Sequence, residues 1–193
     1  MEQRKLIAFL SVIGKLKSNT RHCWTTSDRQ ESVAEHSWRA AVMAMLLRDE
    51  FPEVNIDRVI RMCLIHDMGE AVTGDIPAFY KTVADETTEA EAVVNLIGML
   101  PPDYVEEFTR LFTEMQAKET PEAKLFKAID NLEAVLSHNE ADLSTWIELE
   151  YTKNLTYGAE NVAYSAYLTE LKRLLNADSR QKIEAGTGKT PLK

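Results

Sequence analysis

Apolar residues recur every three or four positions along most of this chain, which is the spacing of amphipathic helices. The spacing predicts helices over about 6–16, 32–49, 55–71, 85–100, 103–118, 120–136, 141–151 and 158–176. The stretch 18–31 is polar, shows no helical period and is predicted to be irregular. Together these segments predict an all-α fold, a compact single-domain helical bundle over residues 1–176. Residues 177–193 are polar, and we expect a flexible tail there.

Capping residues mark two of these helix starts. Ser32 precedes an apolar run and is followed three residues later by Glu35, which is the capping-box pattern. Thr120 is followed by Pro121, so a capping hydroxyl stands before the proline that helices accept in their first turn. Both helices are therefore expected to begin at defined positions.

The bulk composition narrows the range of functions. The 193 residues are enough to bury one core, and a net charge of -9 at pH 7 repels polyanions, so no nucleic acid polymer is expected as a partner. No apolar run approaches the ~20 residues of a membrane span, so no membrane partner is expected. Cys23 and Cys63 are too few for a disulfide framework, and the N-terminus has no cleavage-site pattern. The expected compartment is the cytoplasm.

The adjacent residues His66 and Asp67 interrupt an apolar run, 62–68, that otherwise reads as helix core. Burial of an imidazole and a carboxylate is unfavourable unless a partner compensates them, and a divalent metal does this well. His36 on the preceding helix and Asp130 on a later one complete the order H…HD…D. Two imidazoles and two carboxylates suit manganese, iron, cobalt, nickel and zinc alike. Such a set leaves positions for water, which becomes a nucleophile near neutral pH.

Three segments carry a more specific pattern around these residues. Residues 31–37, 66–77 and 122–130 read ESVAEHS, HDMGEAVTGDIP and EAKLFKAID. With these motifs the chain resembles the HD-domain metal-dependent phosphohydrolases, and among them the branch of bacterial 5′-deoxynucleotidases and the related HD domain-containing protein 2. The resemblance covers most of the chain and implies a helical bundle of the HD-domain type.

The resemblance also implies the metal ligands and the metal content. The positions that match the family's ligands are His36, His66, Asp67 and Asp130. It implies one divalent metal ion per chain, whose identity among Mn, Co, Zn, Ni, Fe and Mg stays open. His22 and His138 are the remaining histidines, and neither has the spacing of binuclear HD enzymes, so a mononuclear site is expected.

Two further carboxylates match the catalytic residues of the family. Glu70 follows Asp67 by three residues, so the helical period is expected to place it on the same helix face, beside the metal. Asp75 stands in the Gly74-Asp75 pair past the end of the predicted helix, and the resemblance implies that it protonates the leaving 5′-oxygen. The resemblance therefore implies that Glu70 and Asp75 transfer the protons of the reaction.

The residues expected to contact the substrate lie in the stretch before the second helix. Arg21 matches an arginine that holds the phosphate, a task suited to the guanidinium fork. In the bacterial deoxynucleotidases a tryptophan follows that arginine and helps to exclude a ribose 2′-hydroxyl. Here His22 follows, and the tryptophan is Trp24. Selectivity for deoxyribose therefore stays open.

These matches predict a phosphomonoester hydrolase that removes the 5′-phosphate of (deoxy)ribonucleoside 5′-monophosphates by means of a metal-activated water. A first alternative keeps the site but changes the substrate to a nucleoside triphosphate, a cyclic nucleotide or a phosphonate. The few basic residues near the motifs favour a monophosphate. A second alternative is a nucleotide-binding protein that does not catalyse a reaction. The intact set of metal ligands and both carboxylates argues against this alternative. The resemblance also implies a homodimer.

Overall fold

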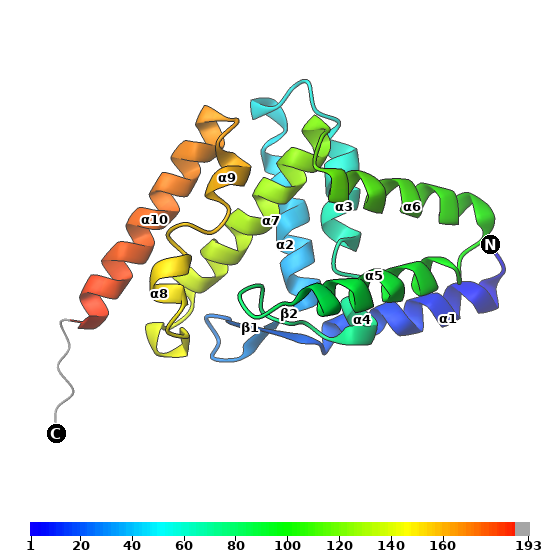
Figure 1. Ribbon diagram of the computed structural model, residues 1–193, viewed down its shortest axis with the longest axis horizontal. Helices are drawn as coiled ribbons and strands as arrows, with labels where there is room; N and C mark the ends of the chain where they lie inside the picture. The colour runs from blue at the N-terminus through cyan, green and yellow to red at the C-terminus, as the bar shows by residue number, and fades with distance from the viewer. Residues whose placement is uncertain (188–193) are drawn as a thin grey trace.

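Helix α7 (Pro121–Glu140) runs through the middle of the molecule, and several of the longer helices pack against it (Figure 1). α2 (Val33–Leu46), α3 (Ile56–Ile65) and α6 (Pro102–Ala117) contact α7 along one side of its length. α10 (Ala166–Thr187) packs against its other side. The predicted helical bundle is therefore confirmed.

The computed structural model describes residues 1–187. The other elements are α1 (Gln3–Ile13), β1 (Thr20–Trp24), β2 (Gln30–Ser32), α4 (Glu70–Thr73), α5 (Val83–Ile97), α8 (Glu150–Lys153), α9 (Ala159–Val162) and short 3₁₀ turns at Gly14–Lys17, Arg48–Glu50 and Leu143–Thr145. In the described part of the chain, no helix is long and apolar enough to cross a membrane.

In the described part of the chain, the core consists of two large clusters of apolar side chains and a small third one of Leu16, Val33 and Ala71. The largest cluster joins α2, α3, α7 and α10, and its most deeply buried members include Val59, Met62, Leu125, Ile129 and Leu132. Each such aliphatic side chain contributes about 1.5–3 kcal/mol when it is fully buried. The second cluster joins α1, α5 and the turn after α3 through Phe9, Met68, Val93, Leu96, Ile97 and Leu100. α7 is central because it buries apolar residues on almost every side.

Both capped helix starts are confirmed. The Ser32 hydroxyl accepts a hydrogen bond from the Glu35 N–H at 3.3 Å, and the Glu35 carboxylate accepts one from the Ser32 N–H at 2.8 Å. The Thr120 hydroxyl accepts a hydrogen bond from the Ala123 N–H at 3.2 Å. A cap of this kind contributes about 1 kcal/mol. These caps fix where α2 and α7, which carry His36 and Asp130, begin.

The stretch 18–31 contains an antiparallel hairpin, so the expectation of irregular structure there is wrong. β1 pairs with β2, with Thr20 opposite Ser32. β1 also contacts α7, where Arg21 lies 3.4 Å from Glu133 and the His22 ring lies beside the His138 ring. The hairpin therefore joins two candidate substrate residues to the helix that carries Asp130.

α3 ends at Ile65, whereas the sequence pattern predicted one helix that ran past His66 and Asp67. His66 is the C-cap of α3, and its N–H donates to the carbonyl oxygen of Met62 at 3.0 Å. A turn follows, and the short helix α4 begins at Glu70. The expectation that these residues share one helix is therefore wrong, and a turn brings them together instead.

Two glycines shape the connection around α4. A Cβ atom on Gly69 would lie 2.9 Å from the side chains of Glu89 and Val93, so glycine is needed where α4 packs against α5. Gly74 has a φ of 77°, a backbone conformation that favours glycine. This residue turns the chain into the loop that carries Asp75.

The helix predicted over 141–151 is absent. This segment forms the 3₁₀ turn at Leu143–Thr145, an extended piece and then α8. The Asp142 side chain accepts a hydrogen bond from the Ser144 N–H at 2.8 Å, which stabilises a tight turn. The local turn therefore replaces the helix that the apolar spacing had indicated.

The helix predicted over 158–176 is split into α9 and α10, and α10 continues to Thr187. Ser179 is fully buried, and its hydroxyl hydrogen-bonds to the Leu175 carbonyl oxygen at 3.0 Å. The predicted tail is therefore helical up to Thr187, and its last part, 188–193, lies outside the described residues.

Candidate active site

Four side chains from three parts of the chain meet beside α7. His66 Nε2 lies 3.0 Å from Asp67 Oδ2 and 3.3 Å from His36 Nε2. Asp130 Oδ1 lies 3.2 Å from His36 Nε2 and 3.6 Å from His66 Nε2. The structure thus brings together all four residues that the sequence nominated as metal ligands.

The other ring nitrogen of each histidine is held by a hydrogen bond. His66 Nδ1–H donates to the Cys63 carbonyl oxygen at 2.9 Å, and His36 Nδ1–H donates to the Glu133 carboxylate. Each ring therefore directs Nε2 toward the two aspartates, and a metal bound there would take the place of a hydrogen on Nε2. Metal-binding histidines are oriented in this way. The donor set fits a first-row divalent ion.

Glu133 is fully buried, and the sequence reasoning missed it. Besides His36, it accepts hydrogen bonds from Arg39 Nε at 2.6 Å and from Arg21 at 3.4 Å. Burial raises the pKa of Glu133, but His36 and the two arginines outweigh burial and lower the pKa to about 2. The signal that pointed to it was a charged residue inside the apolar stripe of α7, one turn after Asp130.

Glu70 lies on the other side of Asp67, at the start of α4. It is 3% exposed, and among the described residues its Oε2 has no hydrogen-bond partner. Burial, and then the negative charges of Asp67 and Asp75, raise the pKa of Glu70 to about 10. Burial also raises the pKa of Asp75. A buried carboxylate oxygen without a partner marks a place where a proton or a cation is needed.

A pocket of about 300 Å³ opens onto these groups. Its acidic lining consists of Asp67, Glu70, Asp75, Glu86 and Asp130. Its basic lining consists of Arg21, Lys81 and Lys127. The basic residues provide local positive charge in a protein of net charge -9, which an anionic substrate requires.

The three residues expected to contact the substrate all lie on β1, but only two of them reach this pocket. Arg21 and His22 line it, and Glu31 Oε2 holds the Arg21 guanidinium at 3.0 Å. Trp24 lines a separate hollow near the end of the hairpin. The structure therefore does not bring Trp24 to the other candidate residues.

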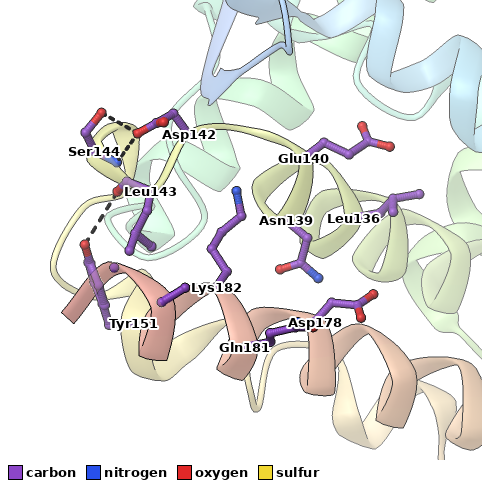
Figure 2. Close-up of a pocket in the computed structure, with 12 residues that line it drawn as sticks. Leu136, Asn139, Glu140, Asp142, Leu143, Ser144, Tyr151, Asp178, Gln181 and Lys182 are labelled. Carbon is purple, nitrogen blue, oxygen red and sulfur yellow. Dashed lines mark hydrogen bonds between the residues drawn. The ribbon is translucent and has the colours of Figure 1, made fainter. Parts of the chain in front are cut away.

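A larger hollow, of about 780 Å³, lies between the end of α7, the 3₁₀ turn after it and α10 (Figure 2). Leu143, Tyr151 and Lys182 are among its lining residues. None of the candidate metal ligands, catalytic residues or substrate-binding residues lines this hollow. Its size alone does not make it the active site, because the converging polar groups lie in the smaller pocket.

The helical fold and the order H…HD…D define a class of proteins, the HD domains. The family model described as HD domain (HD_3) matches residues 13–172, and the chain belongs to this family. Within the family, the chain is 36% identical to 5′-deoxynucleotidase HDDC2 of Homo sapiens over 141 residues, which cover 71% of this chain and 68% of the relative.

Other relatives carry the same kind of name. 5′-deoxynucleotidase HDDC2 of Danio rerio is 30% identical over 193 residues and covers 96% of this chain and 93% of the relative. 5′-deoxynucleotidase hdd1 of Schizosaccharomyces pombe is 32% identical over 159 residues and covers 73% of this chain and 79% of the relative.

Solved structures show the same fold. A predicted metal-dependent phosphohydrolase from Magnetospirillum magnetotacticum MS-1 superposes with a TM-score of 0.80 at 33% identity, over 93% of this chain and 96% of that one. A conserved hypothetical protein from Pyrococcus furiosus superposes with a TM-score of 0.66 at 27% identity, over 91% of this chain and 99% of that one. The HD-domain fold that the motifs implied is therefore confirmed.

Proposed function

We propose that this protein is a metal-dependent phosphohydrolase that removes the 5′-phosphate of nucleoside 5′-monophosphates, deoxyribonucleotides among them. The observation that carries the proposal is the meeting of two imidazoles and two carboxylates at a pocket that also holds Arg21 and an unpartnered Glu70. The relatives named 5′-deoxynucleotidase support this substrate class.

One divalent ion would be held by His36, His66, Asp67 and Asp130. Such an ion, when bound, stabilises negative charge on a phosphate oxygen and lowers the pKa of water. The donor set fits Mn, Co, Zn, Ni or Fe, and the assignment of these four residues as ligands is part of the proposal.

The remaining steps belong to side chains of the pocket. Arg21 would bind the phosphate with its guanidinium, whose position Glu31 fixes at 3.0 Å. Water attacks phosphorus and the bond to the 5′-oxygen breaks. Glu70 takes the proton of the attacking water once positive charge nearby offsets Asp67 and Asp75. Asp75, whose pKa burial raises, gives a proton to the 5′-oxygen.

The size of the pocket favours a monophosphate over a triphosphate. A volume of about 300 Å³ is at the lower end of the range for small-molecule sites. Its basic residues already have carboxylate partners, because Lys127 pairs with Asp130 at 2.7 Å, Lys81 pairs with Glu89 and Arg21 pairs with Glu31 at 3.0 Å. A chain of three phosphates would therefore find few free positive partners.

We further propose that the protein acts as a homodimer in the cytoplasm. Trp38, Met45 and Leu46 on α2 are 63%, 60% and 78% exposed, and such apolar side chains support a contact with a second copy. Cys23 and Cys63 are free thiols, which suits a reducing compartment. Light scattering on the purified protein measures the oligomeric state, and a monomer at micromolar concentration would contradict the dimer.

The function is tested by phosphate release from a panel of ribonucleoside and deoxyribonucleoside 5′-monophosphates and triphosphates with added Mn²⁺ or Co²⁺. We expect release from monophosphates, and a loss of about 100-fold or more in kcat for Glu70→Gln with bound metal unchanged. If the metal-loaded protein releases phosphate from none of these nucleotides, the proposed function is wrong. If phosphate is released from triphosphates alone, the substrates are nucleoside triphosphates and the proposed monophosphate class is wrong.

A further inference from the structure

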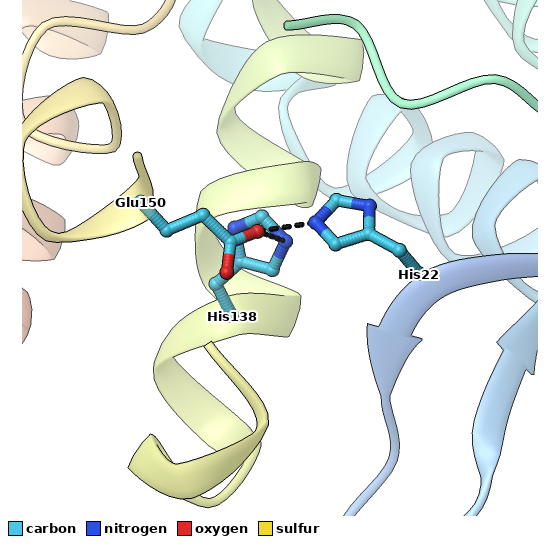
Figure 3. Close-up of side chains that lie close together, drawn as sticks. All are labelled: His22, His138 and Glu150. Atoms are coloured by element: carbon cyan, nitrogen blue, oxygen red, sulfur yellow. Dashed lines mark hydrogen bonds and ion pairs between the residues drawn. The ribbon is translucent and has the colours of Figure 1, made fainter. Parts of the chain in front are cut away.

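A second group of metal-type ligands lies apart from the HD residues, on the wall of the pocket. It consists of His22 on β1, His138 on α7 and Glu150 at the start of α8 (Figure 3). Glu150 Oε1 lies 2.9 Å from His138 Nε2 and also contacts His22 Nε2. The three ligand atoms all lie within 4.8 Å of one another. Two imidazoles and one carboxylate from three separate elements thus converge on one point.

The surroundings of His138 and Glu150 direct their ligand atoms toward that point. His138 Nδ1 lies 3.1 Å from Asn154 Oδ1, and since an amide oxygen only accepts, Nδ1 carries the hydrogen. Glu150 Oε2 accepts a hydrogen bond from the Ile147 N–H at 2.9 Å, which leaves Oε1 for the two rings. With Nδ1 tied in this way, His138 directs Nε2 at the carboxylate oxygen of Glu150. The charge of that carboxylate can be balanced at this point by a hydrogen on the ring nitrogens or by a metal cation that takes its place.

The same arrangement occurs in the HD residues of this chain. There the ring of His66 is tied at Nδ1 to an acceptor, the Cys63 carbonyl oxygen, and directs Nε2 toward Asp67 at 3.0 Å. Here His138 is tied to Asn154 and directs Nε2 toward Glu150. The structure thus contains two groups in which tied imidazoles face a carboxylate.

Burial limits the contact of Glu150 with water, and one side of the group stays open to the pocket. Glu150 is 1% exposed and His138 is 7% exposed, so water does not neutralise the carboxylate. The His22 side chain is 26% exposed, and His22 and His138 both line the pocket. A cation at this point would therefore have positions left for water or for a substrate oxygen.

We propose that His22, His138 and Glu150 bind a second divalent cation, of the zinc and cobalt class that sets of two histidines and one carboxylate favour. The spacing of His22 and His138 along the chain gives no sign of this site, because its ligands come from a strand and two helices. The cation would lie next to Arg21 and add positive charge to the wall where the phosphate is expected to bind. The proposal concerns metal binding and does not depend on the proposed catalytic activity.

The test is the number of metal ions bound per chain. The full-length protein is freed of metal with a chelator, loaded with Co²⁺ or Zn²⁺, separated from free metal by gel filtration and analysed for metal content. We expect two equivalents in the wild type, and one in each of His22→Gln and Glu150→Gln. The visible spectrum of the Co²⁺ form should lose one set of bands in both variants.

Two controls separate this site from the HD residues and from unfolding. Glu148→Gln changes an exposed carboxylate of the same segment and should keep two equivalents. Asp67→Asn should keep one equivalent, at the second site. Circular dichroism checks folding, and His22→Gln covers the case in which Glu150→Gln does not fold, because His22 is partly exposed. One equivalent in the wild type, two in folded His22→Gln, or none in Asp67→Asn would overturn the proposal.

Discussion

Replacement of Glu133 by glutamine tests whether a buried carboxylate behind His36 sets the metal affinity of the HD residues. Glu133 accepts the hydrogen bond from His36 Nδ1 and is fully buried. Glutamine keeps the shape of the side chain but removes its charge and turns one oxygen into a donor. The imidazole of His36 then loses the partner that fixes its orientation and makes Nε2 a better ligand.

The size of the effect follows from the partners of Glu133. Loss of such a partner to a metal-binding histidine typically weakens metal affinity by about 10–100-fold, or about 1.4–2.7 kcal/mol. Breaking a buried ion pair alone destabilises a fold by about 3–5 kcal/mol. Here Arg39 keeps Glu140 at 2.5 Å and Arg21 keeps Glu31 at 3.0 Å. We therefore expect a stability loss of about 2 kcal/mol, below that range.

Calorimetric titration of metal into the metal-free variant measures the affinity, and urea unfolding without metal measures the stability. Glu140→Gln is the matched control, because Glu140 binds the same Arg39 but is exposed at 43% of its side-chain surface and does not contact His36. Its metal affinity should stay within about twofold of the wild type, and its stability within about 0.5 kcal/mol. If folded Glu133→Gln binds metal as tightly as the wild type, the reasoning is refuted.

Three further predictions concern the metal, a tight turn and a buried lysine. Metal at about 100 times its dissociation constant should raise the free energy of unfolding of the metal-free protein by at least about 2.7 kcal/mol, and an equal gain in Asp67→Asn would contradict the assigned ligands. Gly158→Ala should lower the stability to urea by about 2–4 kcal/mol, because Gly158 has a φ of 72° and a new Cβ would lie 2.5 Å from Asn131 Cβ. Gly14→Ala, which has open space, is its control, and equal stabilities would count against the clash. Burial lowers the pKa of Lys172 from 10.5 to about 8, so the unfolded chain binds more protons between these values and the stability relative to Lys172→Met should rise with pH there. From pH 8 to 9.5 this difference should shift by at most about 2 kcal/mol in favour of the wild type, and a difference that does not change with pH would contradict the lowered pKa.

The long helices could be predicted because their signals lie within a few residues of one another. Local patterns mark these helices, namely the caps at Ser32 and Thr120 and the apolar stripes of α2 and α7. Such patterns depend on neighbouring residues alone, so the sequence shows them directly. The meeting of His36 with Asp130 could be predicted only from the motif, since nothing in the spacing shows which helix faces which. The structure supplies that contact at 3.2 Å.

The features that sequence reasoning missed depend on contacts between distant segments. β1 is short, and its pairing with β2 and its contact with α7 leave no periodic trace. The polar end of α10 looked like a tail, but Lys182 donates a hydrogen bond to the Ala141 carbonyl oxygen and Ser179 is fully buried. Glu133 and Glu150 are glutamates, a residue type that usually lies on the surface. For Glu133 the apolar stripe of α7 gave a local signal, but the partners of both residues, which come from distant segments, appear only in the structure.

The charge balance of the pocket gives a reason for metal in substrate binding as well as in chemistry. Each basic residue of the pocket already has a carboxylate partner, in the pairs Arg21–Glu31, Lys81–Glu89 and Lys127–Asp130. A phosphate that enters must compete with these carboxylates, so the basic side chains alone attract it weakly. A metal ion bound by His36, His66, Asp67 and Asp130 would offset the negative charge of the aspartates. The basic side chains would then attract the phosphate more strongly. Inorganic phosphate should therefore bind much more weakly to the metal-free protein than to the metal-loaded one, because the dianion needs a charge that the side chains do not provide.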